Sequence, residues 1–274
     1  MTCVAVLQMC STPDVQENLR DALGLLREAR ERGAIMGFLP ENFSFMGYKE
    51  QDRIAVAEDD GDGPVQQWLA EQSRALGMWI VAGTLPLRRD QGLPGASCLV
   101  FDDQGRRVAR YDKIHLFDVC VSSSEGERLY RESRATRAGE DLVVVDTPAG
   151  RLGLSVCYDV RFPELYRALV DQGAELFSVP SAFTVPTGHA HWEVLLRARA
   201  IENQAFVLAP AQSGKHVGGR DTWGDSMVVD PWGKVMARHA TGVGAVLVDL
   251  DREAQLEVRA KFPSLGHRKF KIRT

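Results

Sequence analysis

The chain has 274 residues and a mass of 30.3 kDa, enough for one large α/β domain or two small ones. Its 45% hydrophobic and 26% charged fractions are those of a globular protein, and its formal net charge of −4 gives no electrostatic footprint for nucleic acid or an anionic membrane. The N-terminal MTCVAVLQMC has no basic segment or cleavage site, and no run of about 18 apolar residues follows. We therefore expect no nucleic-acid partner and no membrane partner.

The cysteines and histidines give no metal-binding pattern. The five cysteines are Cys3, Cys10, Cys98, Cys120 and Cys157. Their odd number and the absence of a CxxC spacing favour reduced thiols in a cytoplasmic protein over a disulfide framework or a zinc site. His189 and His191 are two residues apart, so in a helix they do not share a face. The sequence predicts no metal ion.

The first part of the chain alternates apolar strands with an amphipathic helical pattern. In order, the patterns predict a strand at 4–9, a helix after 13, a strand at 34–40, a helix at 65–76 and a strand at 78–84. Ser11 or Thr12 is expected to cap the first helix, with Pro13 near its first turn. A hairpin of strands at 97–103 and 106–112 then ends at Lys113.

The second part of the chain begins with a polar stretch, 115–140, which predicts a long loop that is either functional or disordered. After it, the patterns predict two strands around a turn at 147–150, the second ending at 157. A helix at 163–172, a strand at 175–180, a helix from about 190 to 203 and a strand at 205–210 are expected next. The last predicted element is a hairpin at 226–239. The last hairpin echoes the first, which indicates a rough internal pseudo-repeat.

Strands separated by helices in some parts and joined as hairpins in others predict an α/β protein with mixed sheets that are covered on both faces. No Gly/Ser/Pro-rich linker divides the chain, so we expect one domain over 1–274. The basic segment at 261–274 is either an exposed tail or a segment that packs on a partner subunit.

Three polar side chains follow apolar strands at the positions where ligands collect in such sheets. Glu41 follows GFLP, Lys113 follows VARYD and Cys157 follows GLSV. A carboxylate, an ammonium and a thiol are the parts of a nucleophilic site. Each residue alone has an ordinary explanation, because free cysteines are commonly buried in cores and charged residues at strand ends are commonly solvated.

Four motifs carry a family resemblance: LPENF at 39–43, RYDKIHLFD at 110–118, GLSVCYDVRFPELYR at 153–167 and HWEVLLRARAIENQ at 191–204. In this order they resemble the nitrilase superfamily of carbon–nitrogen hydrolases, and its Nit-type amidase branch in particular. The resemblance implies a four-layer α-β-β-α sandwich that usually dimerises into an eight-layer block. It also implies a Glu-Lys-Cys triad, which falls on Glu41, Lys113 and Cys157.

The chemistry implied by the resemblance is thiol-dependent amide hydrolysis without a metal or an organic cofactor. Glu41 acts as general base, Cys157 attacks the carbonyl carbon, and Lys113 with the backbone N–H of Tyr158 stabilises the oxyanion. The helix expected near Pro163 and the nearby ammonium favour the thiolate, whereas the carboxylate disfavours it. We therefore expect a coupled titration of the thiol and the carboxylate.

The family also carries a second glutamate on the loop that follows the lysine motif. The match falls on Glu132, although Glu125 and Glu127 lie in the same segment, and a solvated loop charge is the alternative explanation.

Substrate recognition is less determined by the sequence. The Nit branch is associated with amides that carry a carboxylate or keto acid, notably deaminated glutathione and α-ketoglutaramate. Arg161 could bind such a carboxylate with its planar fork, or it could form a structural ion pair with Glu164 or Asp159. Phe183 and Thr184 are candidate pocket walls by position.

The leading hypothesis is an amidase that converts a small carboxylate-bearing amide, such as deaminated glutathione, to a carboxylate and ammonia. An ω-amidase for α-ketoglutaramate and an N-carbamoyl amino acid hydrolase are alternatives within the superfamily, and a catalytically silent scaffold is the alternative outside the enzymes. The expected partners are a small-molecule amide and a second copy of the chain. The expected location is the cytoplasm.

Overall fold

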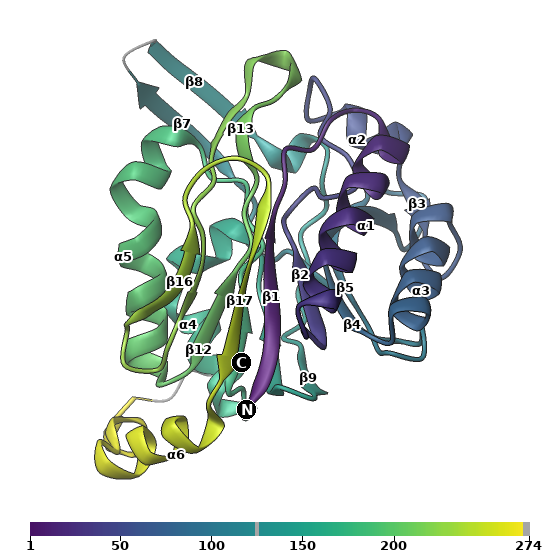
Figure 1. The fold of residues 1–274 in the computed structure, drawn as a ribbon. Coiled ribbons are helices and arrows are strands. Elements are labelled where there is room, and N and C mark those ends of the chain that lie inside the picture. Colours follow the sequence, from purple (N-terminus) through teal and green to yellow (C-terminus); the bar gives the residue numbers. More distant parts are fainter. Residues whose placement is uncertain (124–125, 271–274) are drawn as a thin grey trace.

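The computed structural model describes residues 1–123 and 126–270, and in it two β-sheets pack face to face (Figure 1). The first sheet has the order β17 (Gly244–Leu250), β1 (Thr2–Gln8), β2 (Met36–Leu39), β4 (Trp79–Arg88), β5 (Gly95–Phe101) and β6 (Arg107–Asp112), with β3 (Glu58–Asp59) beside β4. The second has the order β16 (Val235–His239), β15 (Ser226–Val229), β12 (Phe206–Ala209), β11 (Leu176–Ser178), β10 (Gly150–Leu154) and β9 (Val144–Thr147).

Helices cover the outer face of each sheet. The helices are α1 (Val15–Glu31), α2 (Asp52–Ala55), α3 (Pro64–Leu76), α4 (Pro163–Asp171), α5 (Val185–Asn203) and α6 (Arg252–Lys261). Helices α1 and α3 lie outside the first sheet, and α4 and α5 lie outside the second (Figure 1). The predicted four-layer α-β-β-α sandwich is therefore confirmed.

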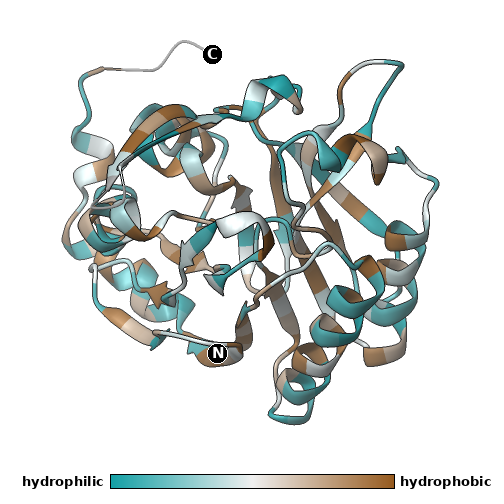
Figure 2. Cartoon of the chain, turned by 90° about the horizontal axis from the view of Figure 1, so that it is seen from above, coloured by the Kyte–Doolittle hydropathy of each residue, from teal (hydrophilic) through white to brown (hydrophobic). Residues whose placement is uncertain are grey.

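Alternation along the strands builds two cores. In β1, Val4 and Val6 face the second sheet, whereas Ala5 and Leu7 face the helices α1 and α3. Both faces of the strand are apolar because both are covered. Figure 2 shows this distribution, with hydrophobic residues on the interior strands and hydrophilic residues along the outward sides of the helices.

The internal pseudo-repeat suggested by the two hairpins extends to whole sheets. From β17 to β6 the successive pairings are antiparallel, parallel, parallel, antiparallel and antiparallel. From β9 to β16 they follow the same sequence. The hairpin β5–β6 thus corresponds to β15–β16.

Two predicted helix starts are wrong. Asp14, not Ser11 or Thr12, caps α1, and its Oδ1 accepts hydrogen bonds from the N–H groups of Gln16 and Glu17 at 2.8 and 3.0 Å. Helix α5 begins at Val185 rather than near 190, because a proline fits the first turn of a helix without losing a hydrogen bond.

The predicted loop at 115–140 is also wrong, because it contains a β-hairpin. Its strands are β7 (Asp118–Ser123) and β8 (Gly126–Arg131), followed by a 3-10 turn, η1 (Glu132–Arg134). This ribbon stands at one end of the sandwich, near the strand β13 (Ser213–Lys215), which pairs with β14 (Asp221–Trp223) (Figure 1). A two-stranded ribbon outside the core needs no apolar face, so the sequence carries no alternating hydrophobic signal there.

The C-terminal segment contacts its own chain as far as Arg268. After α6 comes a 3-10 turn, η4 (Ser264–His267), and Arg268 forms an ion pair with Asp171 at the end of α4. The expected tail at 261–274 is therefore anchored as far as Arg268, Phe270 is 92% exposed, and 271–274 lie outside the described residues. Among the helices of the described ranges, none combines the length and apolar character that a membrane span requires.

Candidate active site

The three polar residues predicted at strand ends meet in one pocket. Glu41 comes two residues after β2, Lys113 directly after β6, and Cys157 three residues after β10. All three line a pocket with about 420 Å³ of empty space. Their exposed fractions are only 3%, 1% and 6%, so the charges and the thiol are held largely away from water.

Close backbone approach fixes the position of Glu41. A Cβ atom at Gly83 in β4 would lie 1.8 Å from the carbonyl oxygen of Pro40, so only glycine allows β4 to pass so near. The backbone N–H of Asn42 donates to Thr84 Oγ1 at 2.8 Å, and Gln212 Nε2 donates to the carbonyl oxygen of Glu41 at 2.9 Å. These contacts hold both sides of the glutamate in place.

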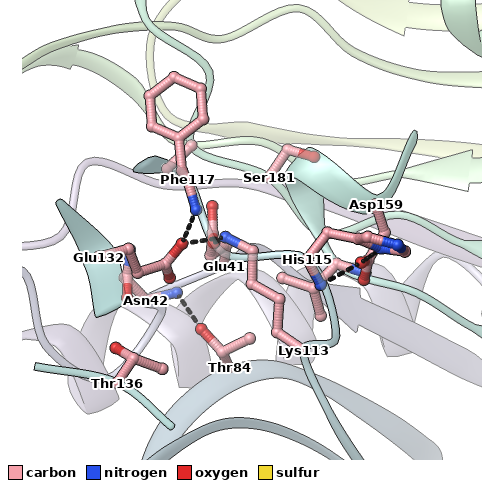
Figure 3. Close-up of polar contacts among 12 residues, drawn as sticks. Glu41, Asn42, Thr84, Lys113, His115, Phe117, Glu132, Thr136, Asp159 and Ser181 are labelled. Atoms are coloured by element: carbon pink, nitrogen blue, oxygen red, sulfur yellow. Dashed lines mark hydrogen bonds and ion pairs between the residues drawn. The ribbon is translucent and has the colours of Figure 1, made fainter. Parts of the chain in front are cut away.

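Lys113 bridges two carboxylates. Its Nζ donates to Glu41 Oε1 at 2.9 Å and to Glu132 Oε2 at 2.8 Å (Figure 3). Burial alone would lower the pKa of Lys113, but the charges of Glu132 and Glu41 raise the pKa well above its usual value. The side chain therefore stays an ammonium. Its backbone is fixed by Gly139, whose N–H donates to the carbonyl oxygen of Lys113 at 2.9 Å.

Glu132 is the carboxylate of the 115–140 segment that reaches the pocket. Its Oε2 also accepts from the Phe117 N–H at 2.8 Å, and Arg53 Nη1 lies 3.5 Å from its Oε1. Burial would raise the pKa of Glu132, but Lys113 and Arg53 hold the pKa down at about 2. Glu127 lies in the exposed strand β8 and does not line this pocket, and Glu125 lies outside the described residues.

Cys157 sits at the start of a tight 3-10 turn, η2 (Cys157–Arg161), with a left-handed φ of 50°. A non-glycine residue in that region is strained and persists only where its surroundings hold it. Here the Cys157 N–H donates to the carbonyl oxygen of Pro180 at 2.9 Å. The buried Asp159 accepts from the Val156 N–H at 2.8 Å and from the Tyr111 hydroxyl at 2.7 Å.

The thiol is neutral in the resting site. Burial and the charge of Glu41 raise the pKa of Cys157, and the opposing influences of Lys113 and the Ala182 N–H do not offset them. Helix α4 begins at Pro163 as predicted, but the 3-10 turn η2 separates it from Cys157, and the influence of a helix start falls off beyond its first turn. Glu41 Oε2 is buried and has no hydrogen-bond partner within the described residues, so a free acceptor oxygen is present beside the thiol.

A backbone donor also adjoins the thiol. The N–H groups of Cys157 and Asp159 donate to the carbonyl oxygens of Pro180 and Val156. The N–H between them, that of Tyr158, has no acceptor among the residues at 1–123 and 126–270. The Tyr158 side chain lines the pocket and packs edge-on against Phe117 at a centroid distance of 5.1 Å.

The predicted substrate-binding residues divide into two groups. Arg161 and Phe183 line the pocket, and the Arg161 guanidinium lies 5.4 Å from the centre of the Phe183 ring and donates to His191 Nδ1 at 3.2 Å. In the described part of the chain, Arg161 has no ion pair with Glu164 or Asp159. Thr184 does not line the pocket; its hydroxyl contacts that of Thr187, which does.

The sequence-based interpretation missed three charged residues of the pocket. Glu50, Arg53 and Arg220 line it, and Glu50 contacts both arginines, with Oε2 2.7 Å from Arg53 Nη2 and Oε1 3.4 Å from Arg220 Nη1. Their segments are polar and irregular, so no periodic pattern marks them. Within the described ranges, no group of three or more His, Cys, Asp or Glu side chains is placed to hold a metal ion.

The sandwich fold and a pocket holding a thiol, an ammonium and carboxylates agree with the family match, which makes the protein a hydrolase of carbon–nitrogen bonds other than peptide bonds. The chain belongs to the carbon–nitrogen hydrolase family, whose model matches residues 3–260.

Relatives with curated names and solved structures agree with this assignment. The chain is 45% identical to the deaminated glutathione amidase of Yersinia enterocolitica, over 97% of this chain and 93% of that protein. It superposes on the NitFhit protein of Caenorhabditis elegans with a TM-score of 0.89 and 40% identity, covering 98% of this chain and 65% of that longer chain. For Nit3 of Saccharomyces cerevisiae, the TM-score is 0.87 at 28% identity, with 98% and 97% coverage.

Proposed function

We propose that this protein hydrolyses amides through a thioester on Cys157. One observation carries the proposal: a buried ammonium bonded to two carboxylates shares a pocket with a buried thiol. Taking these charges out of water is costly, and such arrangements are typical of active sites, where the perturbed groups are used in the reaction.

In the first step, Glu41 takes the thiol proton as the sulfur attacks the carbonyl carbon of the substrate. The free Oε2 of Glu41 supports this role, because it can accept a proton without breaking a hydrogen bond. The raised pKa of Cys157 indicates that proton transfer accompanies attack, since little thiolate exists beforehand. The carbonyl oxygen becomes an oxyanion, which Lys113 and the Tyr158 N–H stabilise.

In the second step, Glu41 returns the proton to the amide nitrogen, the C–N bond breaks and the amine leaves. A water molecule then attacks the thioester while Glu41 takes one of its protons, the C–S bond breaks, and Glu41 returns that proton to the thiolate. The acid product loses its remaining proton to the released amine or to solvent and leaves as the carboxylate. Glu132 acts as a positioning residue, because its contact with Lys113 orients the ammonium without a contact of its own to the thiol.

For the acyl end of the substrate, we propose recognition by Arg161. Its guanidinium lacks a carboxylate partner in the described part of the chain and is stacked over the rings of Tyr158 and Phe183, which restricts its orientation. A planar guanidinium held in this way suits bidentate binding of a carboxylate. Phe183 and the Tyr158 ring then form the apolar walls.

The proposed substrate is deaminated glutathione or a close analogue, which is the substrate that the name of the Yersinia relative states. The amides of glutathione join its residues, so the leaving group is the amine of a dipeptide. The expectation of ammonia as product therefore applies only to primary amides such as α-ketoglutaramate. Both compounds carry the same acyl group and give the same thioester, so the carboxylate product is the appropriate common readout.

The test is mutation of the thiol. We expect Cys157→Ala to abolish formation of the carboxylate product from deaminated glutathione while near- and far-UV circular dichroism stay unchanged. In the wild type, mass spectrometry after rapid acid quenching should detect an acyl adduct on the peptide that contains Cys157. Cys98 is a buried core cysteine away from the pocket, so Cys98→Ala serves as the matched control. Turnover by folded Cys157→Ala protein would exclude the thioester mechanism.

We also propose that the chain works as one domain and as a homodimer in the cytoplasm. Five cysteines without a disulfide support a reducing compartment. Exposed apolar side chains on and near α5 and α6 support self-association: Val194, Ile201, Trp232, Leu256 and Phe262. Light scattering should give twice the mass of the chain, and a monomer at micromolar concentration would exclude the dimer.

A further inference from the structure

A second pocket adjoins the active-site pocket, and we call it the outer groove. It has about 590 Å³ of empty space. Four residues line both this groove and the active-site pocket: Asn42, Glu50, Arg53 and Arg220. The two cavities are therefore neighbouring compartments with a common wall at Glu50, Arg53 and Arg220.

The charges of the outer groove are predominantly positive. Four cationic side chains line it against one carboxylate, Glu50: they are Lys49, Arg53, Arg128 and Arg220. Glu50 is already bonded to Arg53 and Arg220. Among the described residues, neither Lys49 nor Arg128 has a carboxylate partner, and both are exposed. The rim of the groove thus carries two positive charges that no carboxylate at 1–123 or 126–270 neutralises.

Arg220 stands at the junction of the two compartments with unused hydrogen-bonding capacity. Its Nη2 donates to the Ala182 carbonyl oxygen at 3.3 Å, and its contact with Glu50 is long, at 3.4 Å. Its Nε is buried and has no hydrogen-bond partner within the described ranges. A buried donor without a partner is unfavourable, so this nitrogen is suited to bind an acceptor on a ligand that passes the junction.

Apolar groups line the rest of the groove and come from two separate segments. Phe45 and Met46 follow the catalytic glutamate, and Leu129 and Tyr130 belong to β8. Arg128 is placed by its position over the Tyr130 ring, 5.5 Å from the centroid, and by a 2.7 Å hydrogen bond to the Gly219 carbonyl oxygen. Apolar walls with a few fixed polar groups are typical of small-molecule sites.

We propose that the outer groove binds the amine side of an extended amide substrate, with the terminal carboxylate of that arm at Arg128 and Lys49 and a backbone acceptor at Arg220. The ligand class is a secondary amide whose leaving group is a short anionic peptide. This inference rests on the proposed function, because it divides one substrate between two compartments, with the acyl group in the inner pocket and the leaving amine outside.

Two substrates isolate the contribution of the groove. Deaminated glutathione and α-ketoglutaramate have the same acyl group, but their leaving groups are a dipeptide and ammonia. Because both form the same thioester, its hydrolysis is common to them, and differences in kcat/KM arise during binding and acylation. The ratio of kcat/KM for deaminated glutathione to kcat/KM for α-ketoglutaramate therefore measures how much the contacts with the leaving arm contribute to binding and acylation.

The variant that tests the proposal is Arg128→Gln, and the matched control is Arg131→Gln. Arg131 is exposed on the same strand, β8, but lines neither compartment. We expect Arg128→Gln to lower the ratio of kcat/KM for deaminated glutathione to kcat/KM for α-ketoglutaramate by about twofold to fivefold, mainly through KM for deaminated glutathione, since an exposed charge contact is modest. Lys49→Gln combined with Arg128→Gln should lower it further, and Arg131→Gln should leave it unchanged.

A modified substrate provides an independent check. Replacing the terminal carboxylate of the leaving arm by a neutral amide should raise KM in the wild type and should have little additional effect in the double variant Lys49→Gln with Arg128→Gln, because the same interaction is removed twice. Additive effects of the substrate change and the double substitution would overturn the assignment of Arg128 and Lys49.

The remaining outcomes separate this inference from the proposed function. An unchanged ratio in both Arg128→Gln and the double variant, with normal turnover, would overturn the outer groove as a binding site but leave the thioester mechanism intact. Absence of turnover of both substrates by the wild type would overturn the proposed function itself, and the inference with it. Preference of the wild type for α-ketoglutaramate over deaminated glutathione would also overturn the inference.

Discussion

The inner pocket and the outer groove share a wall but use charge in different ways. In the inner pocket, Lys113, Glu41 and Glu132 are at most 5% exposed and are joined by hydrogen bonds of 2.8 and 2.9 Å. On the rim of the groove, Lys49 and Arg128 are exposed and have no carboxylate partner within the described residues. Buried charges interact strongly and are insensitive to salt, whereas exposed charges are weakened by water and screened.

This difference supports our proposal that the inner pocket performs the chemistry and the outer groove recognises the leaving arm. A preorganised ammonium and a fixed carboxylate can stabilise charge as it develops in the reaction, because they do not have to reorient. Exposed cations instead attract an anionic arm and help to select it. Perturbing the inner network should therefore change turnover and stability together, whereas perturbing the rim should change only substrate preference.

The largest effect is expected for Lys113→Met. This change leaves Glu41 and Glu132 buried without the ammonium between them, which should lower the free energy of unfolding by about 3–5 kcal/mol. It also removes an oxyanion donor, so kcat should fall by at least about 10²-fold to 10³-fold. Urea unfolding and steady-state kinetics on the folded fraction would measure both effects.

Lys234→Met is the matched control for this variant, because Lys234 is exposed in the turn before β16 and its side chain lines neither compartment. A Lys113→Met enzyme that stays within tenfold of wild-type turnover would contradict the role of the ammonium. Equal stability of the two variants would contradict the charge network.

Glu132→Gln should lower the free energy of unfolding by less than Lys113→Met does, and the size of the loss should depend on pH. Lys113 and Arg53 hold the pKa of Glu132 at about 2 in the folded chain, below the ordinary value of 4.5 for a glutamate. A depressed pKa stabilises the fold above pH 4.5, and this stabilisation is lost as the pH falls from 4.5 toward 2. The difference of 2.5 units corresponds to about 3 kcal/mol.

Urea unfolding between about pH 2 and pH 7 would check this prediction, because this interval includes the ordinary pKa of a carboxyl side chain, about 4 to 4.5. The stability gap between wild type and Glu132→Gln should be widest at neutral pH and should narrow in acid. Glu127→Gln in β8 is the control, since that residue is exposed and does not line the active-site pocket. A gap that is independent of pH would contradict the charge assignment.

The sequence predicted the inner pocket well because strand ends determine it. Glu41, Lys113 and Cys157 each follow an apolar strand, and such strands are recognisable from local patterns. The fold class was recognisable for the same reason, since long apolar strands require cover on both faces. The 3-10 turn at Cys157 was not predicted, because it is held by a hydrogen bond from Cys157 to Pro180, which is distant in the sequence, and by the contact of Val156 with Asp159, which no periodic pattern marks.

The pseudo-repeat predicts the backbone but not the chemistry. In the parallel pairs, Val6 lies opposite Phe38 and Leu154 lies opposite Ser178. Three residues further along, Met9 therefore corresponds to Cys157, and Glu41 corresponds to Ser181. The two half-structures have equivalent strands, yet each supplies a different functional group, so the repeat alone could not locate the site.

The outer groove was the least predictable region. Its walls come from the irregular 45–50 segment, from α2, from the polar hairpin β7–β8 and from Arg220 before β14. These segments carry only isolated buried side chains, such as Met46 and Tyr130, so none has a hydrophobic periodicity that places its side chains. Their convergence depends on how the loops of both sheets meet at one end of the sandwich.

The smallest expected effect is the response of the outer groove to salt. Raising the ionic strength from about 0.1 M to 1 M shortens the screening length from about 10 Å to 3 Å. We expect KM for deaminated glutathione to rise by about twofold to fivefold relative to KM for α-ketoglutaramate, because Lys49 and Arg128 are exposed. The kcat of both substrates should change little, since the charges of the inner pocket are buried.

Arg128→Gln should reduce the rise of KM for deaminated glutathione with salt, whereas Arg131→Gln should leave that rise unchanged. An equal rise of KM for both substrates would place the screened contact at their common acyl end, and the distinction between the two compartments would then fail.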